Sequence, residues 1–161
     1  MANRPTELVG MGYLTDAKAY LKAASALSHD DISMFSPVYF LLCHGIELSL
    51  KAFILVSGGT ARELKKPDIR HHLNALRDRA YEFGYQPTNA KTDEVISMLA
   101  PYHASHSFRY RDPGFVRYPV IADTIEVLTS MLDEIGPVIW RKVRAEAAMR
   151  LTAQPNNITA P

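Results

Sequence analysis

The segment PVYFLLCHGIELSLKAFILVSGG, residues 37–59, constrains the fold more than any other part of the chain. It is about as long as a membrane span, but it contains His44, Glu47 and Lys51. A charge at mid-membrane costs about 2.5 to 3.5 kcal/mol, so a span is disfavoured. On a helix these three side chains fall within about 60° of one another, and the rest of the circumference is almost wholly apolar. The pattern predicts a central helix with one polar stripe.

The ends of this helix are marked in the sequence. Ser36 is suited to be its N-cap, Pro37 to stand in its first turn, and Gly58-Gly59 to end it. Apolar periodicity predicts further helices over residues 7–28, from near residue 68 to 84, and over about 91–100, and a long last helix from 121. Pro101 is expected to end or kink the fourth of these helices, and Gly136-Pro137 to kink the last.

No internal repeat or Gly/Ser linker divides the 161 residues. We therefore expect residues 1–151 to form a single all-α domain, a bundle of four to five helices. Residues 152–161 are polar and lack a helix cap, so they are predicted to form a disordered tail.

Composition limits the function classes. The chain has 18 Lys+Arg against 17 Asp+Glu, a formal charge of +1, which is too small to hold nucleic acid by bulk charge. Any site for a polyanion must therefore be local. Cys43 is the only cysteine, so a disulfide framework and a cysteine-based zinc site are excluded. The N-terminal MANRPTELVG lacks the apolar core of a signal peptide, and we expect a cytoplasmic protein.

One long connection, YHASHSFRYRDPGFVRYP, residues 102–119, precedes the last helix and is rich in arginine and aromatic residues. Its alternation about Pro113-Gly114 predicts a small hairpin. In an extended strand Phe108 and Tyr110 point to one side and Arg109 and Arg111 to the other. One face would anchor the loop and the other would present guanidinium groups. Alternatively, the rings plug the bundle end and the arginines pair with Asp112 or Glu47.

Three motifs in this order resemble the HEPN superfamily of helical bundles. They are Ile-Glu-Leu-x-Leu-Lys, which holds Glu47 and Lys51, a His-x-Leu helix start in HHLNALRD, and the Arg-Tyr loop FRYR before the last helix. The resemblance covers residues 35–138. It implies a bundle of four or five helices that is commonly dimeric. Many such domains cleave RNA or act in toxin, phage-defence and stress systems, and others serve as partners of nucleotidyltransferases.

The chain departs from the catalytic HEPN pattern, in which a histidine follows an arginine by four to six residues. No histidine follows Arg109, Arg111 or Arg117, because His106 is the last one in the chain. A rearranged set remains, in which His103 or His106 acts as a base and the arginines stabilise charge on phosphate. The candidate catalytic residues are His106, Arg109, Arg111 and Glu47, and the candidate RNA-binding residues are Arg109, Tyr110, Arg111 and Arg117.

Simpler roles compete for the other polar residues. Glu47 and Lys51 are four residues apart, which is typical of a helix ion pair worth about 0.3 to 0.5 kcal/mol. His44 fits a core position, and His71 and His72 fit exposed or structural positions at a helix start. A zinc site of His72, His103 and His106 is disfavoured because neither a cysteine nor a carboxylate lies nearby in the sequence. We therefore expect no metal and no cofactor.

Two functional hypotheses follow. In the first, a HEPN-like homodimer binds or cleaves RNA in a groove between subunits, with arginine on phosphate and tyrosine stacked on bases. In the second, a non-catalytic HEPN-like module binds a protein partner such as a nucleotidyltransferase.

Overall fold

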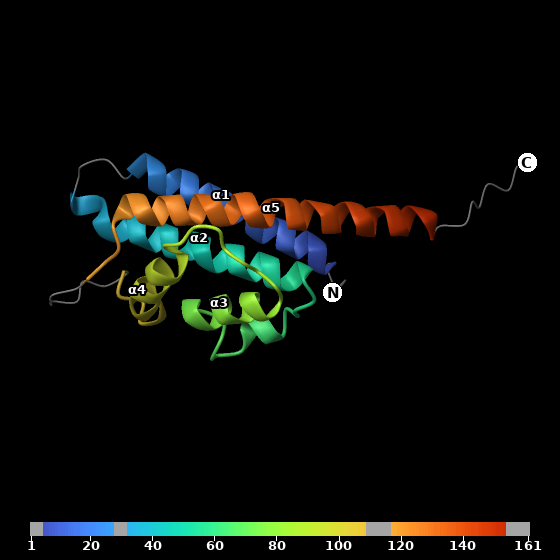
Figure 1. Ribbon diagram of the computed structural model, residues 1–161, viewed down its shortest axis with the longest axis horizontal. Coiled ribbons are helices and arrows are strands. Elements are labelled where there is room, and N and C mark those ends of the chain that lie inside the picture. The colour runs from blue at the N-terminus through green and yellow to red at the C-terminus, as the bar shows by residue number, and fades with distance from the viewer. Residues whose placement is uncertain (1–4, 28–31, 109–116, 154–161) are drawn as a thin grey trace, which may run out of the picture.

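The computed structural model is an all-helical bundle (Figure 1) and describes residues 5–27, 32–108 and 117–153. Within these ranges the chain forms five α-helices and two short 3-10 turns, and no strand. The predicted all-α bundle is confirmed. The predicted hairpin with Arg109, Tyr110 and Arg111, and the predicted tail beyond residue 153, lie outside the described residues.

The helix α2 (Phe35–Val56) is the centre of the fold. It packs against α1 (Thr6–Leu27) and α5 (Ile121–Thr152) on one side, and α3 (Leu73–Glu82) and α4 (Thr92–Ala104) lie on its other side (Figure 1). In the described part of the chain, α2 alone is long and apolar enough to cross a bilayer, yet 83% of its most apolar window is buried inside the bundle. The predicted central helix is confirmed.

The start of α2 differs from the prediction. The helix begins at Phe35, directly after the 3-10 turn Ile32–Met34, so Ser36 lies in the first turn and is not the N-cap. The Phe35 ring packs edge-on against Tyr39 and Tyr118, with centroids 4.6 and 5.2 Å away. Aromatic packing accompanies this helix start, and no side chain caps it.

The end of α2 is as predicted. Gly58 has φ 115°, a conformation that favours glycine. The N–H of Gly59 then donates to the carbonyl of Ile54 at 2.8 Å, which closes the last turn.

Two other helix boundaries also differ from the pattern. The third predicted helix begins at Leu73 rather than near residue 68, because residues 66–72 form successive turns, in which the Arg70 N–H donates to the Lys66 carbonyl at 2.9 Å. The helix α4 continues through Pro101 to Ala104, although proline supplies no N–H to the preceding turn. These two departures place His71 in a turn and His103 on a helix.

An aromatic cluster of Tyr39, Tyr102, Phe108 and Tyr118 packs at one end of the bundle. Phe108 is 8% exposed and stacks on Tyr39 at 5.7 Å, and Tyr102 and Tyr118 pack against it. The hydroxyl of Tyr39 donates to the carbonyl of Pro119. Phe108 is therefore an anchor of the long connection before the last helix, as its position in the alternating pattern predicts.

Candidate histidine-glutamate site

Glu47 lies at the centre of the candidate site, in the middle of α2 and 1% exposed. Its Oε1 accepts a hydrogen bond from Lys51 Nζ at 2.5 Å. Its Oε2 lies 2.5 Å from His103 Nε2 and 3.3 Å from His71 Nδ1. Both oxygens of this buried carboxylate therefore have polar partners, which come from three segments of the chain.

The protonation state of Glu47 follows from these partners. Burial alone would raise the pKa of the carboxyl group. The hydrogen bonds from His103 and Lys51, together with the positive charge of Lys51, outweigh burial and lower the pKa of Glu47 to about 2. Glu47 is thus a carboxylate at neutral pH, and Lys51, itself only 8% exposed, is its counter-charge.

Three histidines, His44, His71 and His103, lie next to this carboxylate, and His106 packs against His71. These four histidines, Glu47 and Lys51 are together called the histidine-glutamate site. Neighbouring ring centroids lie 6.5 Å apart for His44 and His103, 6.4 Å for His71 and His103, and 6.0 Å for His71 and His106. His71 comes from the turns before α3, and His103 and His106 come from the end of α4.

His44 stands one turn before Glu47 on α2 and is half-buried. Its ring stacks on Phe40 at 5.8 Å and meets Tyr20 edge-on at 4.8 Å. Burial lowers the pKa of His44, and the negative charge of Glu47 only partly opposes this. His44 packs against aromatic rings next to the carboxylate. It is half-buried, so it lies at the edge of the core rather than fully inside it.

His106 is held in an unusual backbone conformation at the outer side of the site. Its φ is 60°, and it is the only non-glycine residue with positive φ in the described part of the chain. The His106 N–H donates to the His103 carbonyl at 3.2 Å, and the Ser107 N–H donates to the Tyr102 carbonyl at 3.0 Å. This pair of bonds is a Schellman helix end, in which His106 takes the position that glycine usually occupies.

A small cavity lies among these side chains. It measures about 20 Å³ and is lined by His44, His71, His103 and His106, with Phe40, Tyr102 and Phe108. That volume holds about one water molecule. The side chain of His71 is 38% exposed and His106 is exposed, whereas His103 is buried. A larger ligand would therefore lie across the cavity mouth, next to His71 and His106.

Of the predicted site residues, Glu47 and His106 both belong to this site, and they are connected through His71. Arg117 is exposed and forms no ion pair among the described residues. Arg109, Tyr110 and Arg111 lie outside the described residues, so their predicted roles stay predictions.

Sequence reasoning missed the contact of His71 with Glu47 and the burial of the Glu47-Lys51 pair. The pair was expected to be an ordinary helix ion pair, but side-chain exposures of 2% and 11% place it in the interior. His71 was grouped with His72, but only His71 contacts Glu47, and His72 lies beside Pro101 at a separate pocket. The polar stripe on an otherwise apolar helix was the available signal, since buried charges require partners.

One subset of the site offers ligand atoms for a metal ion. Nitrogens of His44 and His103 and an oxygen of Glu47 lie within 4.8 Å of one another. In a tetrahedral zinc site, bond lengths of about 2.0 to 2.1 Å separate ligand atoms by about 3.3 Å. His103 Nε2 and Glu47 Oε2 are 2.5 Å apart, which is a hydrogen-bond distance. They would have to separate by about 0.8 Å to ligate one ion.

Comparisons of the chain with protein-family models, with curated proteins and with solved structures find no match. The resemblance to HEPN domains therefore rests on the sequence motifs. Residues of two of these motifs meet in space, because Glu47 and Lys51 of the first motif lie against His71, which begins the His-x-Leu motif.

Proposed function

We propose that this chain is a HEPN-like protein that binds RNA and cleaves it by metal-independent acid-base chemistry at the histidine-glutamate site. The observation that carries the proposal is the pair of accessible histidines, His71 and His106, whose ring centroids are 6.0 Å apart. One of them is hydrogen-bonded to a buried carboxylate. Histidine exchanges protons near neutral pH, which suits both the acid and the base of such a reaction.

The chemistry assigns one role to each histidine. When the Nδ1–H of His71 donates a hydrogen bond to Glu47, the proton stays on His71 and Nε2 is the nitrogen that can accept a proton. His71 then removes the proton of a ribose 2′-hydroxyl, whose oxygen attacks the adjacent phosphorus. His106 gives a proton to the departing 5′-oxygen. The products are a 2′,3′-cyclic phosphate and a free 5′-hydroxyl.

The residues proposed to stabilise the phosphate and to contact the RNA are taken from the sequence pattern. Arg109 and Arg111 follow His106 closely in the chain and are the proposed cations that stabilise charge on the phosphate. Arg117 and Tyr110 are the proposed contacts to phosphate and base. We expect the active form to be a cytoplasmic homodimer, in which two such loops line one groove, in a toxin, defence or stress system.

Cleavage is tested with a 5′-labelled RNA in the presence of a chelator. His71→Gln and His106→Gly should each lower the cleavage rate by about 100-fold or more. His72→Gln is the matched control, because His72 neighbours His71 but makes no contact with Glu47, and it should leave the rate within about twofold. Glycine suits the positive φ of residue 106, so His106→Gly should keep its melting temperature while losing activity. Unchanged cleavage in both variants would remove the assignment.

RNA binding is tested separately from cleavage. Replacing Arg109 and Arg111 by alanine should weaken RNA binding and reduce the dependence of log K on log salt by up to about two per subunit. If the wild-type protein binds RNA but leaves it intact, and His106→Ala changes nothing, cleavage is to be dropped and RNA binding kept.

A second candidate function is a non-catalytic partner-binding module, for example a partner of a nucleotidyltransferase. The burial of Glu47 and Lys51 favours this second function, because a buried network of paired polar groups can serve only to specify one packing arrangement of the helices. In that case His71→Gln would lower the melting temperature, and neither the wild type nor the arginine variant would bind RNA.

A further inference from the structure

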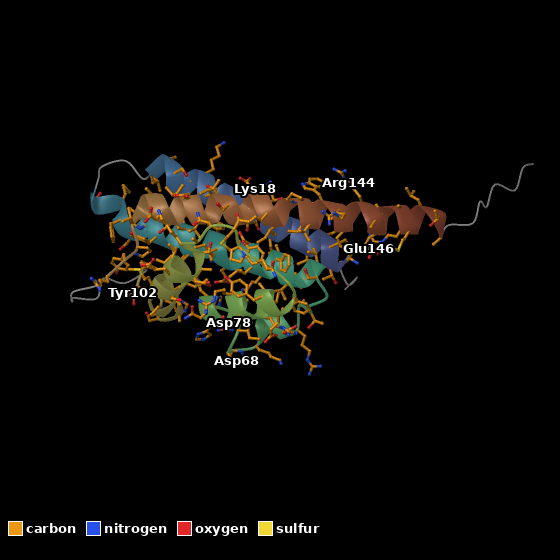
Figure 2. All side chains as sticks on the ribbon, in the orientation of Figure 1. Lys18, Asp68, Asp78, Tyr102, Arg144 and Glu146 are labelled. Atoms are coloured by element: carbon orange, nitrogen blue, oxygen red, sulfur yellow. The ribbon has the colours of Figure 1, made fainter. Side chains whose placement is uncertain are left out.

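A second site lies on another side of the bundle. A groove of about 600 Å³ runs between α1 and α5, lined by Lys18 of α1 and by Asp133, Pro137, Trp140, Arg141 and Arg144 of α5. In Figure 2, Lys18 and Arg144 lie on the α1 and α5 side, whereas Tyr102, next to the histidine-glutamate site, lies on the α4 side. We infer that this groove binds a nucleotide unit, with the base stacked on Trp140 and the phosphate held by Lys18, Arg141 and Arg144.

The charges of the groove favour an anionic ligand. Lys18, Arg141 and Arg144 are exposed, and none of them forms an ion pair with another described residue. The neighbouring Lys142 differs, because its Nζ lies 2.9 Å from Glu146. The groove is therefore lined by three cations and by one carboxylate, that of Asp133. In a chain of formal charge +1 this is a local concentration of positive charge suited to a phosphate.

Trp140 supplies the surface for a base. It is the only tryptophan of the chain, and it is 48% exposed within the groove. Arg144 stands one helical turn after it and Pro137 nearly one turn before it, so the three lie on the same side of α5. A nucleobase stacks on an exposed indole face, and neighbouring arginines hold its phosphate, as in sites for single-stranded nucleic acid. The volume is within the range of small-ligand sites.

Gly136 of α5 lines the groove next to Trp140. A Cβ at Gly136 would meet Leu14 Cδ2 at 3.9 Å, which is an ordinary contact, so core packing does not require glycine here. Glycine inside a helix is nonetheless destabilising.

The same turn offers hydrogen-bond acceptors. Pro137 has no N–H, so it cannot donate to the carbonyl of Asp133, four residues earlier. Asp133 lines the groove. Its carbonyl and its carboxylate are acceptors for hydrogen bonds from ribose hydroxyls or from the amino group of a base. A nucleotide can therefore pair its phosphate with the cations, stack its base on the indole and donate hydrogen bonds to the acceptors, whereas inorganic phosphate can only pair with the cations.

The sole tryptophan reports binding directly. Titration of the wild-type protein with AMP, with indole excited where adenine does not absorb, should give a saturable change of fluorescence. Adenosine and inorganic phosphate, each lacking one half of the ligand, should bind at least about tenfold more weakly. An oligoadenylate that binds tighter than AMP would identify an RNA strand as the source of the nucleotide, and equal affinity would identify the free nucleotide.

Variants place the ligand in the groove. Arg144→Ala and Arg141→Ala should each weaken AMP binding by about tenfold or more, because each removes a charge-assisted contact. Lys142→Ala is the matched control on the same helix, and it should change the affinity by less than about twofold. Equal binding of adenosine and AMP, a non-saturating signal, or equal losses in Lys142→Ala and Arg144→Ala would overturn the inference. His71→Gln should leave AMP binding unchanged, so the result does not depend on RNA cleavage.

Discussion

Replacing Glu47 by glutamine removes the negative charge among Lys51, His71 and His103 and nearly keeps the side-chain volume. The hydrogen bonds and charge that lower the pKa of Glu47 from 4.5 to about 2 also stabilise the folded state. Each unit by which folding lowers the pKa corresponds to about 1.4 kcal/mol of stability. The lowered pKa of Glu47 therefore contributes about 3 kcal/mol to the free energy of unfolding at neutral pH. Glutamine also leaves Lys51 buried without a counter-charge, which brings the expected loss to about 3 to 5 kcal/mol.

The stability that Glu47 contributes should depend on pH in one direction. Since the folded pKa is below the ordinary value of 4.5, the stabilisation is fully present above about pH 4.5 and is lost as the pH falls toward about 2. The stability of the wild type should therefore fall over this window by more than that of Glu47→Gln. The difference between the two proteins should shrink toward acid.

Urea unfolding followed by circular dichroism, repeated from about pH 7 to about pH 3, measures this difference. Asp16→Asn is the control, because Asp16 is exposed on α1 and forms no ion pair with a described residue. The free energy of unfolding of Asp16→Asn should lie within about 0.5 kcal/mol of that of the wild type at neutral pH. A loss below about 1 kcal/mol in Glu47→Gln at pH 7, or a loss that is the same at every pH, would refute the account of a buried, partnered carboxylate.

Three further predictions concern packing, metals and assembly. Phe108→Ala should lower the free energy of unfolding by about 3 to 5 kcal/mol, because the ring is buried and stacked on Tyr39; a loss under about 1 kcal/mol in urea unfolding would contradict this. A chelator should leave the melting temperature unchanged, since Lys51 and the histidines already partner Glu47; a lower melting temperature would reveal a bound ion. Sedimentation at micromolar concentration should show a homodimer, and a monomer would remove the model of a groove shared between subunits.

Hydrophobic periodicity predicted the all-α bundle and its central helix because periodicity is a property of a single segment and does not depend on which other segments pack against it. The apolar circumference of α2 requires covering helices, whichever helices these are, and Gly58-Gly59 ends the helix through local backbone conformation. The alternating pattern likewise identified Phe108 as an anchoring residue. Where tertiary contacts compete with a local signal, the sequence-based prediction was wrong. Phe35 begins α2 on an aromatic cluster, and Ser36 does not cap it.

The candidate site was predictable only in part. Glu47 was predictable because it is a carboxylate inside an apolar helical segment of the sequence. His106 was predictable because arginines follow it closely in the sequence. The partners of Glu47 are separated from it by 24 residues for His71 and by 56 for His103. Their approach depends on the turns over residues 66–72 and on the continuation of α4 through Pro101, neither of which periodicity encodes. Packing brings these histidines onto the polar stripe, because a buried charge is stable only with its partners in contact.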